Sequence, residues 1–169
     1  EDALAAGMEG CELLYHVAGV NTLCPDDPAE LFHVNVRGAE AAVRAAARAK
    51  VRRVVLTSST SALGEAEGTV GNEDSPHRGS FMSAYERSKQ EAERVALAGA
   101  DGELEVVIVN PSAVYGPGPP GTASFEDDLL RPVLRSRLPM LPPGGCGVVF
   151  SDGIGRGQLL AALKGRPGE

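Results

Sequence analysis

The chain has 169 residues, of which 43% are hydrophobic and 23% are charged, a composition typical of one soluble globular domain. Its net charge is −7 at pH 7 and its arginines are scattered along the sequence, which argues against the basic stripe of a nucleic-acid-binding protein. The three cysteines, Cys11, Cys24 and Cys146, are odd in number and form no CxxC pair, so neither a disulfide framework nor a metal site is expected.

No apolar run in the sequence approaches the roughly 20 residues that a membrane-spanning helix needs. A signal-peptide pattern is also missing from the sequence. We therefore expect a cytoplasmic protein that binds neither membranes nor nucleic acid. The first residue is Glu1 rather than Met, and we expect the chain to be a piece of a longer protein.

Apolar runs alternate with helical segments over the first two thirds of the chain. In chain order we expect the end of a helix at 1–11, a strand at 12–19, a helix at 26–50, a strand at 53–59, a loop at 64–80, a helix that carries Tyr85 and ends at 101–102, and a strand at 104–109. This alternation predicts α/β architecture, with βαβ units in a parallel sheet and right-handed crossovers.

The last third of the chain is rich in proline and glycine. These residues lead us to expect no regular structure at 111–121, followed by a helix at 124–138 that Pro132 interrupts. A short strand at 147–150 and a last helix at 158–164 complete the predicted elements. The GxGxG pattern at 153–157 has Gln158 where a dinucleotide-binding loop needs its third glycine, so we do not expect it to bind a dinucleotide.

Small and polar residues follow the predicted strands. In open parallel sheets, ligands bind outside the carboxyl ends of the strands. The segments at those ends are Ala18-Gly19, Ser58-Ser59 and Asn110-Pro111-Ser112. The sequence therefore predicts a ligand site at this edge of the sheet.

Tyr85 and Lys89 are spaced as a proton-transfer pair. Residues four apart on a helix share one face, so the Lys89 ammonium can lie near the Tyr85 phenol. A free phenol has a pKa near 10, and a nearby positive charge helps it to exchange protons at neutral pH. The chain has thirteen arginines against three lysines, yet a lysine stands at this position. A compact ammonium suits a phenolate better than a guanidinium fork does.

Three further residues could serve this site, each with a plainer alternative. Ser59 could donate a hydrogen bond to a substrate carbonyl, although a serine at a strand end often only satisfies turn backbone. Asn35 lies in an otherwise apolar helix, where its amide could bond a water or a kinked backbone carbonyl, or could simply be exposed. For His16 we expect a hydrogen-bonded core histidine rather than a ligand.

Taken together, these stretches resemble the extended short-chain dehydrogenase/reductase family (the NAD-dependent epimerase/dehydratase family), in the branch of dihydroflavonol-4-reductase-like and hopanoid-associated sugar epimerase-like proteins. Five matches occur in the family's order with its approximate spacings. They are Tyr15-His16-Val17-Ala18-Gly19, Asn35-Val36-Arg37-Gly38, Val54-Val55-Leu56-Thr57-Ser58-Ser59, Tyr85-Glu86-Arg87-Ser88-Lys89 and Val109-Asn110-Pro111-Ser112-Ala113-Val114-Tyr115-Gly116-Pro117-Gly118.

The resemblance implies roles for individual residues. Tyr85 would be the catalytic acid/base, Lys89 would lower its pKa and hold the nicotinamide ribose, and Ser59 would polarise the carbonyl. Asn35 would be linked to the proton-relay water. The cofactor, NAD or NADP, would contact Ala18, Gly19, Ser58, Tyr85, Lys89, Pro111, Ser112 and Val114.

The implied fold is a Rossmann-type doubly wound parallel sheet that is partial, because the first βαβ unit with its glycine-rich phosphate loop would lie before Glu1. We expect one partial domain over 1–169, in which 119–150 contributes to a substrate-side lobe. As given, the chain should bind a dinucleotide poorly, because the pyrophosphate would lack its helix N-terminus.

The implied function is an NAD(P)-dependent oxidoreductase that transfers a hydride to or from a small-molecule carbonyl or alcohol and could form a homodimer. A nucleotide-sugar epimerase or dehydratase would use the same residues, and a non-catalytic dinucleotide-binding module would have the same fold. The sequence leaves the substrate and the choice between NAD and NADP open.

Overall fold

The computed structural model describes residues 1–22, 25–100, 102–117, 131–135, 145 and 147–169. At its centre lies a three-stranded parallel sheet in the order β1 (Leu13–His16), β2 (Arg53–Thr57) and β3 (Glu105–Val109). The strands are in register, with Leu14 opposite Val54 and Val54 opposite Val106. The predicted parallel α/β sheet is confirmed.

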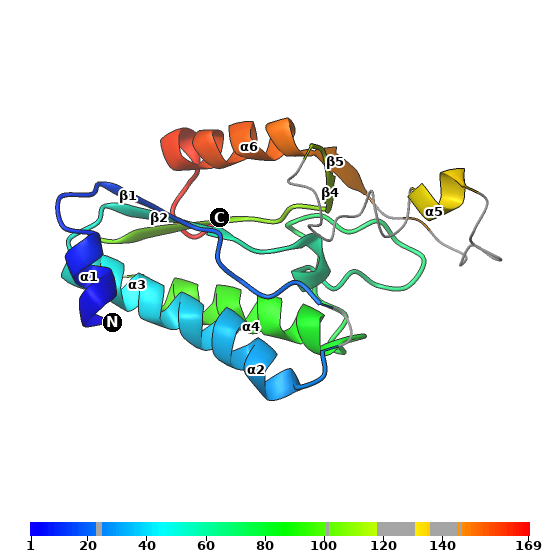
Figure 1. The fold of residues 1–169 in the computed structure, drawn as a ribbon, viewed down its shortest axis with the longest axis horizontal. Helices are drawn as coiled ribbons and strands as arrows, with labels where there is room; N and C mark the ends of the chain where they lie inside the picture. Colours follow the sequence, from blue (N-terminus) through cyan, green and yellow to red (C-terminus); the bar gives the residue numbers. More distant parts are fainter. Residues whose placement is uncertain (23–24, 101, 118–130, 136–144, 146) are drawn as a thin grey trace.

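Helices cover both faces of this sheet (Figure 1). One face carries α3 (Gly38–Arg48) and α4 (Ala84–Ala98), and the other carries α6 (Ser151–Lys164). The remaining elements are α1 (Asp2–Gly7), α2 (Pro28–Phe32), the π-helix η1 (His33–Arg37), the 3₁₀ turn η2 (Thr60–Ala62), α5 (Arg131–Leu134), and the parallel pair β4 (Ala113–Tyr115) and β5 (Val148–Phe150). The architecture is that of a Rossmann-type fold.

Small side chains let α3 pack closely on the sheet. Ala39, Val43 and Ala46 of α3 are fully buried against Val54 and Val106, which are buried as well. Apolar β-branched strand residues and an alanine-rich helix face therefore form one continuous core.

The buried Arg53 joins α6 to the sheet. Its Nη1 donates to the Ala162 carbonyl at 2.7 Å, and its Nε donates to Glu105 Oε2 at 2.7 Å. One guanidinium thus satisfies a carbonyl near the C-terminus of α6 and pairs with a carboxylate on β3, which fixes α6 over this end of the sheet.

Two predictions for the last third of the chain are wrong. The segment 111–121 contains the short strand β4, because Ala113–Tyr115 pairs with β5. The last helix begins at Ser151, not at 158, so the GxGxG stretch lies inside α6. Glycine disfavours helix by up to about 1 kcal/mol per residue, but the buried Gln158 and Ala162 hold α6 against the sheet.

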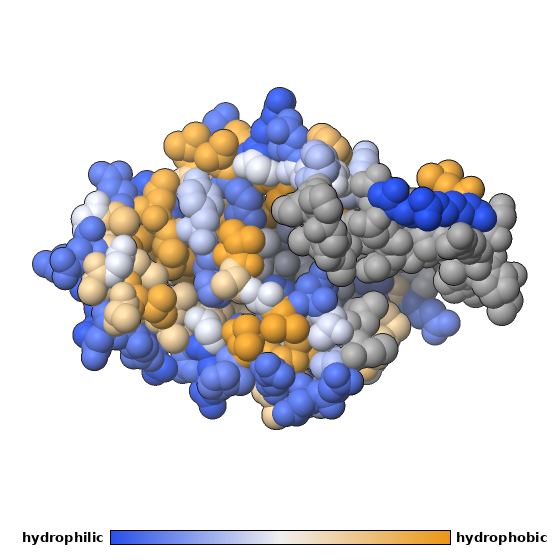
Figure 2. All heavy atoms as spheres, viewed as in Figure 1, coloured by the Kyte–Doolittle hydropathy of each residue, from blue (hydrophilic) through white to orange (hydrophobic). Residues whose placement is uncertain are grey.

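Other predictions for this region fall on residues outside the described ranges. These cover most of the helix expected at 124–138, where α5 occupies 131–134, and most of the lobe expected at 119–150. Within the described ranges, no helix is both long and apolar enough to cross a membrane. Figure 2 shows hydrophobic side chains at the position of α6, where Leu159, Leu160 and Leu163 are exposed.

Candidate active site

Backbone hydrogen bonds continue between the two segments that follow β2 and β3 at their carboxyl ends. Ser58 N donates to the Val109 carbonyl at 2.8 Å, and Thr60 N donates to the Pro111 carbonyl at 3.0 Å. The predicted segments Ser58-Ser59 and Asn110-Pro111 therefore lie side by side, at the edge where the sequence places the ligand site.

Tyr85 lies in the first turn of α4, where the chain has a strong helix start signal. The Ser83 side chain caps the helix by accepting a hydrogen bond from Glu86 N at 3.1 Å. Tyr85 is only 7% exposed. Burial raises the pKa of the Tyr85 phenol, and the nearby Ser59 hydroxyl partly opposes that shift. The phenol is thus a protonated group at neutral pH beside Ser59.

Lys89 follows one helical turn later and lies close to the Tyr85 ring. Its Nζ is 5.9 Å from the centre of that ring and donates to the Thr57 carbonyl at 3.3 Å. Burial lowers the pKa of Lys89, and the negative charge of Glu93 works in the opposite direction. The structure thus brings Tyr85, Lys89 and Ser59 together, as their spacing and the family resemblance predict.

Asn35 is 3% exposed, so the alternative of an exposed helix asparagine is wrong. Val20 N donates to Asn35 Oδ1 at 2.7 Å, and Asn35 Nδ2 donates to the Val20 carbonyl at 3.0 Å and to Ser88 Oγ at 3.0 Å. Asn35 lies in the π-helix η1, a local distortion that is frequent at functional sites. Its amide joins the segment after β1 to the helix of Tyr85 and Lys89.

Gly19 lies against both Asn35 and Lys89. A Cβ atom added at Gly19 would lie 3.1 Å from Asn35 Oδ1 and 3.3 Å from Lys89 Nζ, which is tighter than most real contacts. The absence of a side chain keeps the space beside the ammonium open. Ala18, the other residue predicted in this turn, is exposed.

The remaining predicted residues divide into two groups. Ser58 is buried, and the Pro111 carbonyl accepts the hydrogen bond from Thr60 N, so both residues belong to the junction of β2 and β3. Ser112 and Val114 lie towards β5: a Cβ at Gly147 would be 3.2 Å from Ser112 Cβ, and Val114 is paired with Val149.

His16 is half-buried at the end of β1, rather than in the core as predicted. Burial lowers the pKa of the His16 imidazole, and the positive charge of Lys89 lowers it further. A neutral imidazole therefore stands near the Lys89 ammonium.

The sequence reasoning missed Glu93, and it placed Asn110 at the ligand-binding edge of the sheet without assigning it a role. Asn110 Nδ2 donates to Glu93 Oε1 at 2.7 Å and to the Ser59 carbonyl at 3.0 Å. Burial raises the pKa of the Glu93 carboxyl, while the nearby Ser58, Asn110 and Lys89 lower it. The four-residue step from Lys89 to Glu93 was the signal that could have identified this residue.

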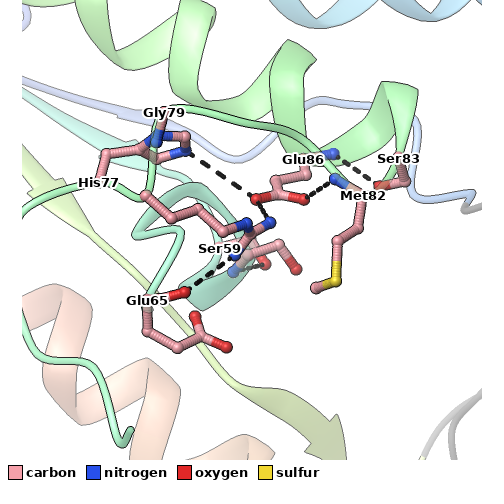
Figure 3. A network of polar contacts seen from close by, with 9 residues as sticks. Ser59, Glu65, His77, Gly79, Met82, Ser83 and Glu86 are labelled. Atoms are coloured by element: carbon pink, nitrogen blue, oxygen red, sulfur yellow. Dashed lines mark hydrogen bonds and ion pairs between the residues drawn. The ribbon is translucent and has the colours of Figure 1, made fainter. Parts of the chain in front are cut away.

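A second missed network holds the loop before α4 (Figure 3). Glu86 is 3% exposed, pairs with Arg78 and accepts a hydrogen bond from Met82 N at 2.7 Å. Arg78 also donates to the Glu65 carbonyl at 3.2 Å. This ion pair fixes the polar loop to the start of the helix that carries Tyr85.

The chain is similar to known proteins of one family. The family model described as the 3-beta hydroxysteroid dehydrogenase/isomerase family matches residues 1–142. A putative dihydroflavonol 4-reductase of Synechocystis sp. is 33% identical over 162 residues, which cover 94% of this chain and 47% of that protein. The chain spans about half the length of the curated relatives it matches.

Solved structures share the same fold. The crystal structure of gox2253 superposes with a TM-score of 0.89 at 30% identity, over 99% of this chain and 52% of that one. MoeE5 in complex with UDP-glucose and NAD superposes with a TM-score of 0.77 at 28% identity, over 97% of this chain and 56% of that one.

Proposed function

The chain belongs to the 3-beta hydroxysteroid dehydrogenase/isomerase family, and from this premise we propose that it carries the proton-transfer centre of an NAD(P)-dependent oxidoreductase. The extended short-chain dehydrogenase/reductase family predicted from the sequence is confirmed at the level of the family. The single observation that carries the proposal is the convergence of Tyr85, Lys89 and Ser59 at the carboxyl end of β2.

Tyr85 is the proposed acid/base. Because burial raises the pKa of its phenol, Tyr85 is protonated at neutral pH and can donate a proton to a substrate oxygen when a carbonyl is reduced. In the reverse direction it accepts the proton of an alcohol. The Lys89 ammonium near the ring stabilises the phenolate that forms after donation.

Ser59 is the proposed hydrogen-bond donor to the same substrate oxygen. Its Oγ accepts a hydrogen bond from Ser61 N at 3.2 Å, which orients the side chain, and its single hydroxyl proton, which favours the Tyr85 phenolate, can turn to a substrate oxygen bound beside Tyr85. Asn35 supports the site through its bonds to Val20 and Ser88 rather than by contact with a substrate.

The residues around Lys89 fit a nicotinamide cofactor. Among the described residues, Lys89 Nζ has one hydrogen-bond partner, the Thr57 carbonyl, so its other protons can bind a cofactor hydroxyl. Gly19 leaves the space beside this ammonium open. A bound NAD or NADP would supply or accept the hydride. We propose that it is held by Ala18, Gly19, Ser58, Tyr85, Lys89, Pro111, Ser112 and Val114.

A nucleotide-sugar epimerase or dehydratase is the second candidate, because MoeE5, a structure with the same fold, was solved with UDP-glucose and NAD. The same proton transfer serves both reactions. Net conversion of the cofactor during turnover would favour a reductase, whereas turnover of UDP-glucose without net conversion would favour the epimerase. The predicted homodimer and cytoplasmic location remain predictions.

The test compares Tyr85→Phe with Tyr15→Phe in the intact protein. The activity is measured with a dihydroflavonol and NADPH, a 3β-hydroxysteroid and NAD, and UDP-glucose and NAD. We expect Tyr85→Phe to lower kcat on the accepted substrate by about 10²- to 10⁴-fold, with only a small change in cofactor affinity by calorimetry, because the other seven proposed cofactor contacts and the aromatic ring remain. Tyr15 is exposed, and its variant should keep full activity. Unchanged turnover by Tyr85→Phe would overturn the proposal.

A further inference from the structure

We infer that Glu93 and Asn110 form a positioning pair behind the candidate active site, which holds the end of β2 that carries Ser59 and supplies the counter-charge of the buried Lys89. The inference rests on the proposed function, because it assigns the two residues to the support of the proton-transfer centre.

Asn110 connects α4 to the end of β2. It comes directly after β3, and its Nδ2 donates to Glu93 Oε1 at 2.7 Å and to the Ser59 carbonyl at 3.0 Å. A side-chain amide has two N–H donors on one nitrogen, so one group can satisfy both acceptors. The backbone at Ser59 is thereby fixed relative to the helix of Tyr85 and Lys89.

Glu93 continues the helix face that carries Tyr85 and Lys89. The three residues are spaced four apart on α4, which places them one turn after another on the same face. Glu93 stands farthest from Tyr85 along the helix, so it acts through Lys89 and Asn110 rather than on the substrate.

The groups around Lys89 include one carboxylate on the next turn of α4, Glu93. From β1, His16 lies near Lys89, and the positive charge of Lys89 helps to keep its imidazole neutral. From β2, the Thr57 carbonyl accepts the Lys89 hydrogen bond. From α4, Tyr85 lies beside it and Glu93 favours its charged form. Within the described part of the chain, Glu93 is the carboxylate whose charge acts on Lys89.

The plain alternative is that Glu93 and Asn110 form a half-buried polar contact that only packs α4 against β3. Such a contact would affect stability and would leave the titration of Lys89 unchanged. If Glu93 supports Lys89, removal of its negative charge must lower the pH at which Lys89 titrates, because that charge favours the ammonium form.

The experiment follows the Lys89 titration by NMR in the intact protein labelled at lysine Cε. Lys50 and Lys164 are exposed and serve as internal references. We expect Glu93→Gln to move the Lys89 titration midpoint to lower pH and Glu93→Asp to restore most of it. Glu91→Gln, on the same helix and paired with Arg87 at 3.8 Å, should leave the midpoint unchanged. Asn110→Ala keeps the Glu93 charge, so it should leave the Lys89 midpoint nearly unchanged while it lowers kcat, because the backbone at Ser59 loses its bond to the amide.

Activity gives a second measurement. In Glu93→Gln we expect kcat to fall about 10-fold with KM nearly unchanged, because a displaced acid/base slows the chemical step. An unmoved Lys89 midpoint in Glu93→Gln, or an equal shift in Glu91→Gln, would overturn the inference. If Glu93→Gln does not fold, Glu93→Ala takes its place, with the same expected shift of the Lys89 midpoint and the same result that would overturn the inference. The NMR titration needs no turnover, so a failure of the proposed function would be seen separately in the Tyr85→Phe comparison.

Discussion

The side-chain amide of Asn35 pairs with the backbone of Val20 in both directions, accepting from its N–H at 2.7 Å and donating to its carbonyl at 3.0 Å. The same Nδ2 donates to Ser88 Oγ, which in turn donates to the Tyr85 carbonyl at 2.8 Å. One buried amide therefore connects the segment after β1 to the helix that carries the proposed acid/base.

Asn35→Ala should destabilise the protein by about 2–3 kcal/mol, because it leaves partly buried backbone groups of Val20 and the Ser88 hydroxyl without their partner. Urea unfolding measures the loss. The control is Asn21→Ala, at an exposed position next to Val20, which we expect to change the free energy of unfolding by less than about 0.5 kcal/mol. Equal effects of the two substitutions would contradict the assigned role.

Gly19→Ala should reduce kcat with only a small change in stability. The added methyl group would lie 3.3 Å from Lys89 Nζ and 3.1 Å from Asn35 Oδ1, so the ammonium must move. The matched control is Gly38→Ala in α3, where a Cβ meets nothing within 4 Å. That control should stabilise the protein by about 0.5–1 kcal/mol, because alanine favours helix, and should keep full activity. Full activity of Gly19→Ala would show that Lys89 tolerates the shift.

Ser59→Ala should raise the pKa of Tyr85 further. Burial already raises this pKa, and the Ser59 hydroxyl opposes the shift by favouring the phenolate. Removal of the hydroxyl removes the opposing effect, so Tyr85 should ionise at higher pH than in the unmodified protein. Phenolate absorbance across an alkaline titration measures this, with Tyr85→Phe identifying its contribution among the three tyrosines. A midpoint that stays in place or moves to lower pH would refute the contact.

Arg78→Ala should destabilise the protein by about 2–3 kcal/mol, because it leaves the Glu86 carboxylate buried without its counter-ion. Removing both charges in Arg78→Ala/Glu86→Gln should recover part of that loss. Arg37→Ala breaks an exposed pair with Glu40 and should change stability by less than about 0.5 kcal/mol. Thermal unfolding of the unmodified protein and the three variants measures these differences. A loss of stability in Arg78→Ala as small as that in Arg37→Ala would argue against a buried pair.

The sequence by itself determined the parallel α/β sheet, the pairing of Tyr85 with Lys89 and the family. These features are local or periodic: alternating apolar runs specify strands and helices, and a four-residue step on a helix fixes which side chains meet. The family could be recognised because five short sequence motifs occur in the family's order. The roles assigned to the site residues remain predictions.

Only the tertiary structure decided which distant groups meet. Asn35 bonds residues 15 and 53 positions away, and Asn110 bonds Glu93 and Ser59 across 17 and 51 positions. It also decided that α6 begins at Ser151 and that β4 pairs with β5, against the local preference of glycine and proline. The physical reason is that these contacts depend on how the elements pack, and packing energy overrides weak local propensities.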